Sequence, residues 1–411
     1  MEVNPFTINV PNEVLNDLSR RLENVRWPDE IPQSDWDYGC NLDYLKNLVD
    51  YWRTGFDWRT QEAKLNAFHH FKSKVDGLDI HFIHERGKGP NPIPLVITHG
   101  WPSTFYEMHK IIPLLADPGA HGGDPADAFD VVAPSLPGFG FSDHPTERGT
   151  DVEQVAGMWH KLMTEHLGYP RFAVQGGDIG AGVTSRLGIG YADSLIGIHL
   201  TSVPRPTPYL GPGSRELTEA EKTHMAQRER WQQDEGGYSH IQGTKPQTLS
   251  YGLNDSPAGL AAWIVEKYRA WSDCGGDVEK RFTKDELLTN ITIYWVTQTI
   301  GSSVRMYYEN QRNNWVMGKD EQIPAPAAIT VFPGEISRPP REWAERSYNV
   351  CRWTEMARGG HFAAFDEPEL LAEDVRSFFR ADRTTGTLEI RPETPFLGNL
   401  GRTFVSDKAT F

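Results

Sequence analysis

The segment Gly176-Gly-Asp-Ile-Gly180 constrains this chain more than any other stretch of the sequence. It follows an apolar run at 172–174 that predicts a short buried strand, and we expect a helix from Ala181 onward. Glycines two positions before and after a residue allow a very tight strand-to-helix turn, because a Cβ there would clash. Such a turn lifts Asp178 to the carboxyl edge of a parallel sheet. Asp178 is therefore a candidate nucleophile, although a helix N-cap or a dinucleotide loop would also fit the turn alone.

Strand and helix patterns alternate around this turn. Alternation of this kind indicates right-handed βαβ units, and hence an α/β fold whose mostly parallel sheet has helices on both faces. A hairpin with the turn Asp76-Gly77 precedes the alternation. The predicted strands lie at 94–98, 129–134, 172–174, 195–201, 327–332 and 348–354, and the predicted core helices lie at 105–115, 152–167 and 368–379.

The patterns divide the chain into four segments. Amphipathic helices before residue 90 predict an N-terminal lid segment that packs on the core. The alternation stops after the strand at 195–201, and the helices that follow predict an inserted, aromatic-rich cap. The expected boundaries are 1–90 for the lid segment, 91–203 and 315–380 for the core, 204–314 for the cap and 381–411 for a tail.

Two further residues stand at strand ends in an informative order. Glu335 follows the strand at 327–332, and His361 lies in Gly359-Gly-His after the last strand. Nucleophile, acid and histidine is the chain order of the catalytic triad in the α/β-hydrolase fold. We therefore predict Asp178 as nucleophile, His361 as general base and Glu335 as the acid that orients the histidine.

The loop His99-Gly-Trp-Pro-Ser103 comes directly after a buried strand. A backbone loop at this place can direct an N–H group at a developing oxyanion. We expect the backbone N–H groups of Trp101 and Ile179 to form this oxyanion hole. His99 is expected to brace the backbone rather than to transfer protons.

An aspartate in the place of the nucleophile limits the reactions that the site can catalyse. Attack on an acyl carbon would give an unproductive anhydride, whereas attack on a saturated, strained or activated carbon gives an alkyl ester. His361, taken as neutral near pH 7, would then activate water to hydrolyse that ester. A halide leaving group would need N–H donors beside the nucleophile, and Ile179 offers no such side chain. An epoxide oxygen needs an acid that stays protonated, and the tyrosines of the cap can supply one.

At this point the chain resembles a known family, the epoxide hydrolases of the α/β-hydrolase fold, in their microsomal-type branch with an N-terminal lid. The resemblance extends from near the N-terminus to about residue 380. It is carried by the segments Arg26-Trp-Pro, His99-Gly-Trp-Pro102, Pro134-Ser-Leu-Pro-Gly-Phe-Gly-Phe-Ser142, Gly176-Gly-Asp-Ile-Gly180, Gln242-Gly-Thr-Lys-Pro246, Leu253-Asn-Asp-Ser-Pro-Ala-Gly-Leu260 and Gly359-Gly-His-Phe-Ala-Ala-Phe365.

The resemblance implies an enzyme that converts an epoxide and water into a vicinal diol without a cofactor or metal. It maps the two cap tyrosines that hydrogen-bond the epoxide oxygen to Tyr238 and Tyr307, with Tyr308 as a neighbour that could take the second place. It implies small hydrophobic, often aromatic epoxides as substrates, and a role in detoxification or aromatic hydrocarbon catabolism. The sequence departs from the family at Ile179, where many relatives have tryptophan, and in the missing membrane anchor of the mammalian forms.

Composition limits the partners and the location. Lys and Arg number 41 against 56 Asp and Glu, giving a net charge of −15 that argues against nucleic acid. The three cysteines are widely spaced and predict neither disulfides nor a metal cluster. No signal peptide or membrane helix is visible, so we expect a soluble cytoplasmic protein, with a homodimer as a further expectation. A haloalkane- or haloacetate-type dehalogenase and a catalytically silent binding protein of the same fold stay open as alternatives.

Overall fold

The computed structural model describes residues 2–203 and 205–385. Within them, one sheet has the strand order β1-β2-β3-β5-β4-β6-β7-β8-β9. Neighbours from β5 to β9 in this order are parallel, and the pairs that involve β1, β2 and β3 are antiparallel. The predicted mostly parallel α/β sheet is therefore confirmed. The strands are β1 (Val3–Phe6), β2 (His70–Val75), β3 (Leu78–Glu85), β4 (Ile93–Thr98), β5 (Phe129–Pro134), β6 (Phe172–Gly176), β7 (Leu195–Leu200), β8 (Ile323–Val331) and β9 (Tyr348–Glu355).

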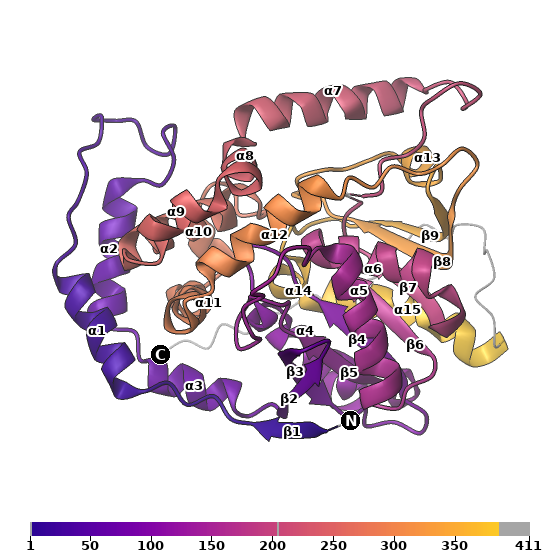
Figure 1. The fold of residues 1–411 in the computed structure, drawn as a ribbon, viewed down its shortest axis with the longest axis horizontal. Coiled ribbons are helices and arrows are strands. Elements are labelled where there is room, and N and C mark those ends of the chain that lie inside the picture. The colour runs from indigo at the N-terminus through magenta and orange to yellow at the C-terminus, as the bar shows by residue number, and fades with distance from the viewer. Residues whose placement is uncertain (1, 204, 386–411) are drawn as a thin grey trace, which may run out of the picture.

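Helices cover both faces of the sheet, as Figure 1 shows. α5 and α6 pack against each other over the central strands, and α4 and α15 pack against each other on the opposite face. Two predicted helices are divided. Pro113 has no N–H to bond the carbonyl of residue 109, so a 3₁₀ turn at Phe105–His109 precedes α4, and a π-helical turn at Leu162–His166 ends α5. The core helices are α4 (Ile111–Ala116), α5 (Val152–Lys161), α6 (Asp178–Gly190), α13 (Arg341–Ala344), α14 (Ala363–Asp366) and α15 (Pro368–Thr385).

Six α-helices occur between β7 and β8 in the described chain, and in Figure 1 they lie above and to the left of the sheet. Residues of this cap contact the loops that follow the carboxyl ends of the strands, since the His361 N–H donates to the Trp271 carbonyl at 2.9 Å. The cap therefore covers the sheet edge that carries the predicted triad. Its helices are α7 (Glu219–Asp234), α8 (Gly237–Thr244), α9 (Pro246–Leu253), α10 (Pro257–Ala270), α11 (Lys284–Thr297) and α12 (Ile300–Arg312).

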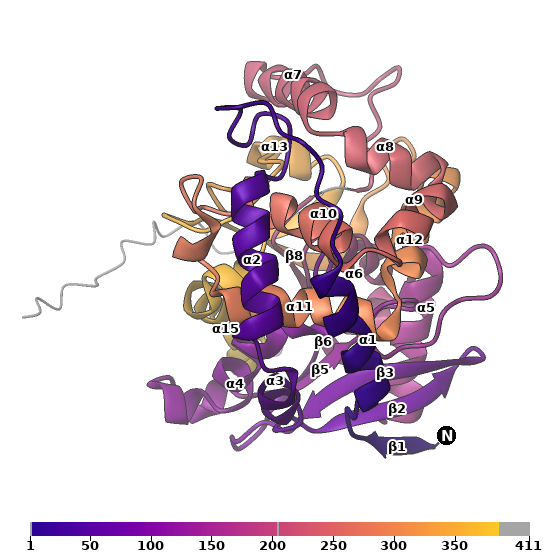
Figure 2. The same ribbon diagram turned by 90° about the vertical axis from the view of Figure 1, so that its left-hand side faces the viewer.

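The N-terminal helices α1 (Asn12–Glu23), α2 (Leu42–Thr54) and α3 (Trp58–Leu65) run along one side of the molecule (Figure 2). α1 and α2 pack on cap helix α10, and α2 and α3 also contact α11. Buried Trp52 joins α2 to α11, because its Nε1–H donates to Thr292 Oγ1 at 3.1 Å. The N-terminal helices thus pack on helices α10 and α11 of the cap.

The proposed division into four segments stays a prediction. The last helix, α15, runs to Thr385 rather than to residue 379, because no proline or glycine interrupts the sequence before Gly386. The remainder of the predicted tail, 386–411, lies outside the described residues.

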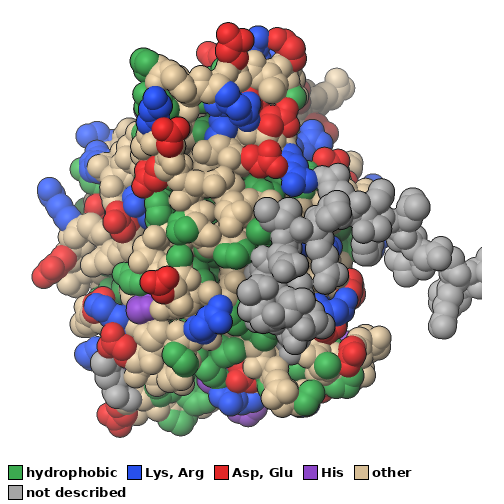
Figure 3. Space-filling view, turned by 90° about the vertical axis from the view of Figure 1, so that its right-hand side faces the viewer, with side chains coloured by type: hydrophobic (Ala, Val, Ile, Leu, Met, Phe, Trp, Pro, Cys, Tyr) green, Lys and Arg blue, Asp and Glu red, His purple; other side chains and the backbone are tan. Residues whose placement is uncertain are grey.

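Two further observations concern the expected partners and location of the protein. They are the distribution of charge on the surface and the character of the helices. On the described part of the face in Figure 3, basic side chains lie among acidic ones rather than in one continuous patch. Among the described residues, no helix combines the length and the apolar character that crossing a bilayer requires.

Candidate active site

The turn between β6 and α6 has the tight geometry that its glycines predict. Asp178 has φ +48°, and it is the first residue of α6, so the helix begins three residues earlier than Ala181. A Cβ on Gly176 would lie 2.3 Å from the carbonyl oxygen of Gly180, and a Cβ on Gly180 would lie 2.1 Å from that of Thr98. The turn can therefore form only with glycine at both places, and it holds Asp178 in a left-handed conformation that side chains rarely adopt.

The structure brings the three predicted triad residues together from three strand ends. His361 Nε2 lies 3.6 Å from Asp178 Oδ2, and His361 Nδ1 lies 2.8 Å from Glu335 Oε1. The side chains of Glu335 and His361 are 3% and 5% exposed, whereas that of Asp178 is 23% exposed. The acid and the histidine are thus shielded from water while the carboxylate of Asp178 stays open to an incoming molecule.

Backbone N–H groups bind the Asp178 carboxylate, one of them at Oδ1, the oxygen that does not face His361. The Trp101 N–H donates to Asp178 Oδ1 at 2.9 Å, and the Ile179 N–H also stabilises the carboxylate. Burial alone would raise the pKa of Asp178, but hydrogen bonds from His361, Trp101 and Ile179 hold that pKa below its usual value. Asp178 is consequently a carboxylate at neutral pH, the form that a nucleophile requires.

The charge state of His361 differs from the sequence expectation. Burial opposes a positive charge on its ring, but the carboxylates of Glu335 and Asp178 raise the pKa of His361 well above the ordinary value. With Asp178 charged, this raised pKa favours the imidazolium form of His361, whereas the sequence predicts a neutral ring near pH 7. Because one of the two charges belongs to Asp178, neutralising Asp178 would lower the pKa of His361 again.

Four aromatic rings form one wall beside Asp178. The ring of Tyr238, on α8, stacks on Trp101 with centroids 5.4 Å apart and an interplanar angle of 10°. Tyr307, on α12, lies edge-on to both rings at 5.8 Å and 5.9 Å, and Trp271 lies 5.1 Å from Tyr238. Burial raises the pKa of Tyr238 and of Tyr307, so both phenols keep their protons at neutral pH.

Tyr308 points to a different neighbour. The guanidinium group of Arg312 lies 3.1 Å from the centroid of the Tyr308 ring. Of the two adjacent tyrosines, the structure places Tyr307 beside Trp101, in the register that the family resemblance implies.

Other polar residues of the neighbouring loops have structural partners. His99 Nδ1–H donates to the Gly100 carbonyl at 3.0 Å, and its Nε2 accepts from the Leu136 N–H at 3.2 Å. Burial lowers the pKa of His99 to about 4, so it braces two loops as a neutral ring. Ser135 Oγ lies 2.8 Å from Nδ1 of buried His81, and the Ser142 hydroxyl donates to the Ser135 carbonyl at 2.8 Å.

The loop of His361 is held by residues that sequence reasoning missed. The Gly359 N–H donates to Asp273 Oδ2 at 3.0 Å, and the Gly360 N–H donates to Asp366 Oδ2 at 2.9 Å. A Cβ on Gly360 would lie 2.6 Å from the Trp271 carbonyl oxygen, so the loop packs directly on the cap. The Gly-Gly pair before His361 was the available signal, because two glycines in succession permit such close backbone contact.

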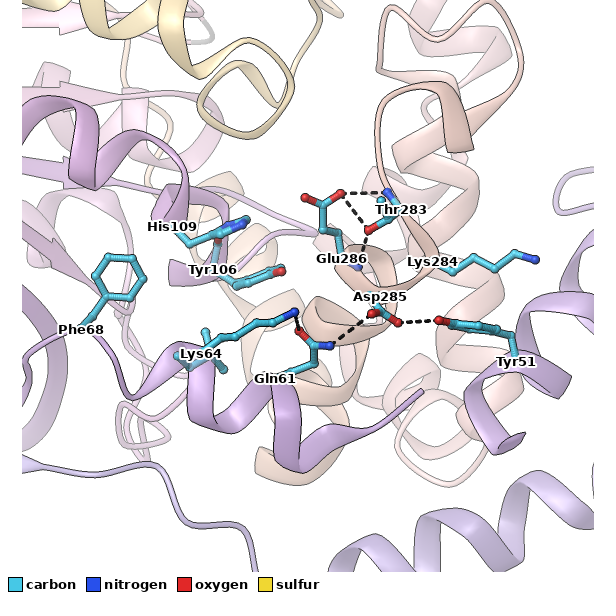
Figure 4. Close-up of a pocket in the computed structure, with 11 residues that line it drawn as sticks. Tyr51, Gln61, Lys64, Phe68, Tyr106, His109, Thr283, Lys284, Asp285 and Glu286 are labelled. Carbon is cyan, nitrogen blue, oxygen red and sulfur yellow. Dashed lines mark hydrogen bonds between the residues drawn. The ribbon is translucent and has the colours of Figure 1, made fainter. Parts of the chain in front are cut away.

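A cavity of about 420 Å³ lies elsewhere, between the N-terminal helices and α11 (Figure 4). Its lining includes none of the triad residues. Tyr51 Oη donates to Asp285 Oδ1 at 2.9 Å, and Gln61 Nε2 donates to Asp285 Oδ2 at 3.3 Å (Figure 4). These hydrogen bonds join α2 and α3 to α11, and we assign the cavity no catalytic role.

In residues 2–203 and 205–385, no group of three or more His, Cys, Asp or Glu side chains is arranged to hold a metal ion. The absence of a metal and of a cofactor stays an expectation.

A carboxylate at a strand-to-helix turn, a buried acid–histidine pair and an inserted helical cap define an α/β-hydrolase with an aspartate at the nucleophile position. Comparisons with known proteins agree. The family description "Epoxide hydrolase N terminus" matches residues 3–108, and "alpha/beta hydrolase fold" matches residues 93–211.

Relatives and solved structures identify the family. A Stigmatella aurantiaca protein, whose name assigns it provisionally to the epoxide hydrolases, is 46% identical to this chain. The alignment covers 92% of this chain and 85% of that protein. "Epoxide hydrolase 1" of Sus scrofa is 40% identical to this chain, and the alignment covers 92% of this chain and 88% of that protein. The Aspergillus niger epoxide hydrolase structure superposes with a TM-score of 0.80 at 30% identity, covering 93% of this chain and 97% of that one. This chain belongs to the epoxide hydrolase family, and it is an enzyme, a hydrolase that acts on epoxides.

Proposed function

We propose that the enzyme opens its epoxide through an ester on Asp178, with His361 and Glu335 driving hydrolysis of that ester and Tyr238 and Tyr307 donating to the epoxide oxygen. The observation that carries this mechanism is the placement of the Asp178 carboxylate. It accepts the Trp101 N–H on one oxygen and faces His361 Nε2 with the other, beside the wall that contains both tyrosines.

Ring opening is the first half of the reaction. A carboxylate oxygen of Asp178 attacks an epoxide carbon, a C–O ester bond forms, and the C–O bond of the ring breaks. The released oxygen takes the proton of a tyrosine, which becomes a phenolate. Both tyrosines belong to the aromatic wall beside Asp178, with ring centroids 5.9 Å apart, and both keep their protons at neutral pH, so both phenols can donate to the oxygen as it leaves.

Hydrolysis is the second half, and the first half prepares it. Esterification removes the negative charge of Asp178, so the pKa of His361 falls and the imidazolium releases its proton to solvent. The neutral ring then accepts a proton from the attacking water. The hydroxide attacks the ester carbonyl, and the N–H groups of Trp101 and Ile179 stabilise the oxyanion. The tetrahedral intermediate collapses, its ester C–O bond breaks, and the leaving diol oxygen takes the proton held by His361. The Asp178 carboxyl passes its own proton to the phenolate, and a proton from solvent restores the charge of His361.

The substrate class follows from the wall of the site. Trp101, Trp271 and the two tyrosines present aromatic surface beside the nucleophile, and flat aromatic groups stack favourably on such surfaces. We therefore infer hydrophobic epoxides, aromatic ones among them, as substrates. A cytoplasmic location and a homodimer stay predictions.

The test traps the ester. His361→Gln enzyme is mixed with one equivalent of styrene oxide, and its intact mass and then its peptide masses are measured. We expect a mass increase equal to the whole epoxide on the peptide that contains Asp178. Asp178→Ala enzyme is the control, and full activity in that variant would contradict the mechanism. A haloalkane in a parallel sample tests the dehalogenase alternative, which would be favoured by alkylation from the haloalkane alone with release of halide.

A further inference from the structure

Lys267 is a buried cation that the mechanism above does not use. It lies on α10, among the buried apolar residues Leu260, Ile264 and Tyr268, and it is 7% exposed. Lysine is almost never buried to this degree unless a partner holds its charge. The neighbouring carboxylate of Glu266 forms an ion pair with it, so the cation has a partner of opposite charge inside the cap.

The ammonium group lies over the ring of Tyr238. Its Nζ is 4.9 Å from the centroid of the Tyr238 ring and 5.8 Å from that of Trp271. A cation over an aromatic face is attracted by the electrons of the ring, and the attraction strengthens where water is excluded. Trp101 stacks on the same tyrosine, so stacking and the cation together fix the orientation of the Tyr238 ring.

Apart from a hydrogen bond with Tyr307, which lowers the pKa of Tyr238, the other surroundings of this tyrosine oppose the loss of its proton. Burial and the negative charge of Asp178 raise the pKa of Tyr238, and Glu266 and Glu335 act in the same direction. Glu235, after the end of α7, is a further carboxylate in the field of Lys267. Ring opening nevertheless requires negative charge to develop on the phenolic oxygen as its proton moves to the epoxide oxygen.

We propose that Lys267 is a positioning residue for ring opening, which orients Tyr238 and stabilises the negative charge that develops on its oxygen. The proposal rests on the proposed function of Tyr238 as a proton donor. In the step concerned, Asp178 forms its bond to carbon, the ring C–O bond breaks, and the Tyr238 proton passes to the released oxygen. Lys267 keeps all of its own protons and acts only through its charge.

The test measures the two half-reactions separately in the full-length enzyme. Lys267→Met is compared with wild type in single-turnover experiments with styrene oxide, in which rapid quenching and intact-mass analysis follow the formation and the decay of the ester. We expect ester formation to slow about tenfold, equivalent to ~1.4 kcal/mol of transition-state stabilisation, while ester decay changes little. Lys267→Arg should recover most of the rate, because it restores the charge.

A double-mutant cycle with Tyr238→Phe distinguishes this role from a structural one. If Lys267 acts through the phenol, Lys267→Met should slow ester formation in wild type but not in the Tyr238→Phe enzyme. Equal slowing in both backgrounds, or equal slowing of formation and decay, would overturn the proposal. Lys280→Met, which removes an exposed lysine of the cap, is the matched control.

Three further outcomes can be distinguished. If Lys267→Met does not fold, the comparison is made with Lys267→Gln and Lys267→Arg, and a charge-independent rate would again overturn the proposal. If wild type forms an ester and Tyr238→Phe slows its formation while every Lys267 variant behaves as wild type, this inference fails and the proposed function stands. If no ester forms on Asp178 in wild type, both fail.

Discussion

The Glu335→Gln variant isolates the contribution of the negative charge of Glu335 to ester hydrolysis, the second half of the reaction. Glu335 Oε1 lies 2.8 Å from His361 Nδ1, and the pair is almost fully buried. Glutamine keeps the size and an oxygen acceptor but removes the negative charge that stabilises the imidazolium. Ring opening does not need that imidazolium, whereas ester hydrolysis forms it. The variant should therefore keep ester formation and lose ester decay.

The expected loss can be worked from the geometry. At an effective dielectric constant of about 20, opposite unit charges about 4 Å apart attract by about 4 kcal/mol. A difference of 1.36 kcal/mol corresponds to about one pKa unit or about tenfold in rate. Loss of the charge should thus lower the pKa of His361 and slow ester decay roughly 100- to 1,000-fold.

The assay is a rapid-quench time course with styrene oxide, in which intact mass gives the fraction of enzyme held as ester. Wild type should show a low steady-state fraction, and Glu335→Gln should approach complete esterification. Glu355→Gln, which neutralises an exposed carboxylate at the end of β9, should behave as wild type. The assignment of Glu335 is wrong if ester formation slows as much as decay, or if turnover is lost without any ester accumulating.

Three other outcomes are expected. Tyr307→Phe should slow ester formation by about 10²-fold or more, as loss of a general acid does, while Tyr308→Phe should not; the reverse result would shift the assignment by one residue. Burial lowers the pKa of His81 well below its ordinary value, so the unfolded chain binds a proton below about pH 6.5 that the folded chain does not. The free energy of unfolding should therefore be highest above that pH and should decrease as the pH drops. If denaturant titrations of His81→Gln show the same dependence of this free energy on pH as wild type, the reasoning is wrong. Gly180→Ala should cost about 3 kcal/mol or more of stability in thermal and denaturant unfolding, because its Cβ would meet backbone; Gly252→Ala, which meets nothing within 4 Å, should not lower the melting temperature.

The elements of the site that could be predicted from sequence are those with local requirements. The spacing of Gly176 and Gly180 around Asp178 is a steric condition, and the structure meets it with the contacts already described. Glu335 and His361 were found because parallel strands end at one sheet edge, which places successive strand ends near each other.

Contacts between distant segments could not be predicted in this way. The stacking of Tyr238 on Trp101 joins the cap to a core loop, and only the family resemblance pointed to that tyrosine. β1 was missed because Val3-Asn-Pro-Phe6 has no alternating pattern, and its proline suits an edge strand. Lys267 did leave a signal, since it follows Ile264 by three residues and so shares the buried face of α10.

The attachment of the His361 loop to the cap has a consequence for how the enzyme can move. His361 and Gly359 donate hydrogen bonds to Trp271 and Asp273, and both acceptors belong to the cap. Any motion that lifts residues 271–273 from the sheet must break these bonds and displace the general base. Opening of the cap at this end would therefore switch off hydrolysis in the same event, so substrate entry and diol exit that leave the enzyme competent must use the part of the cap farthest from these residues.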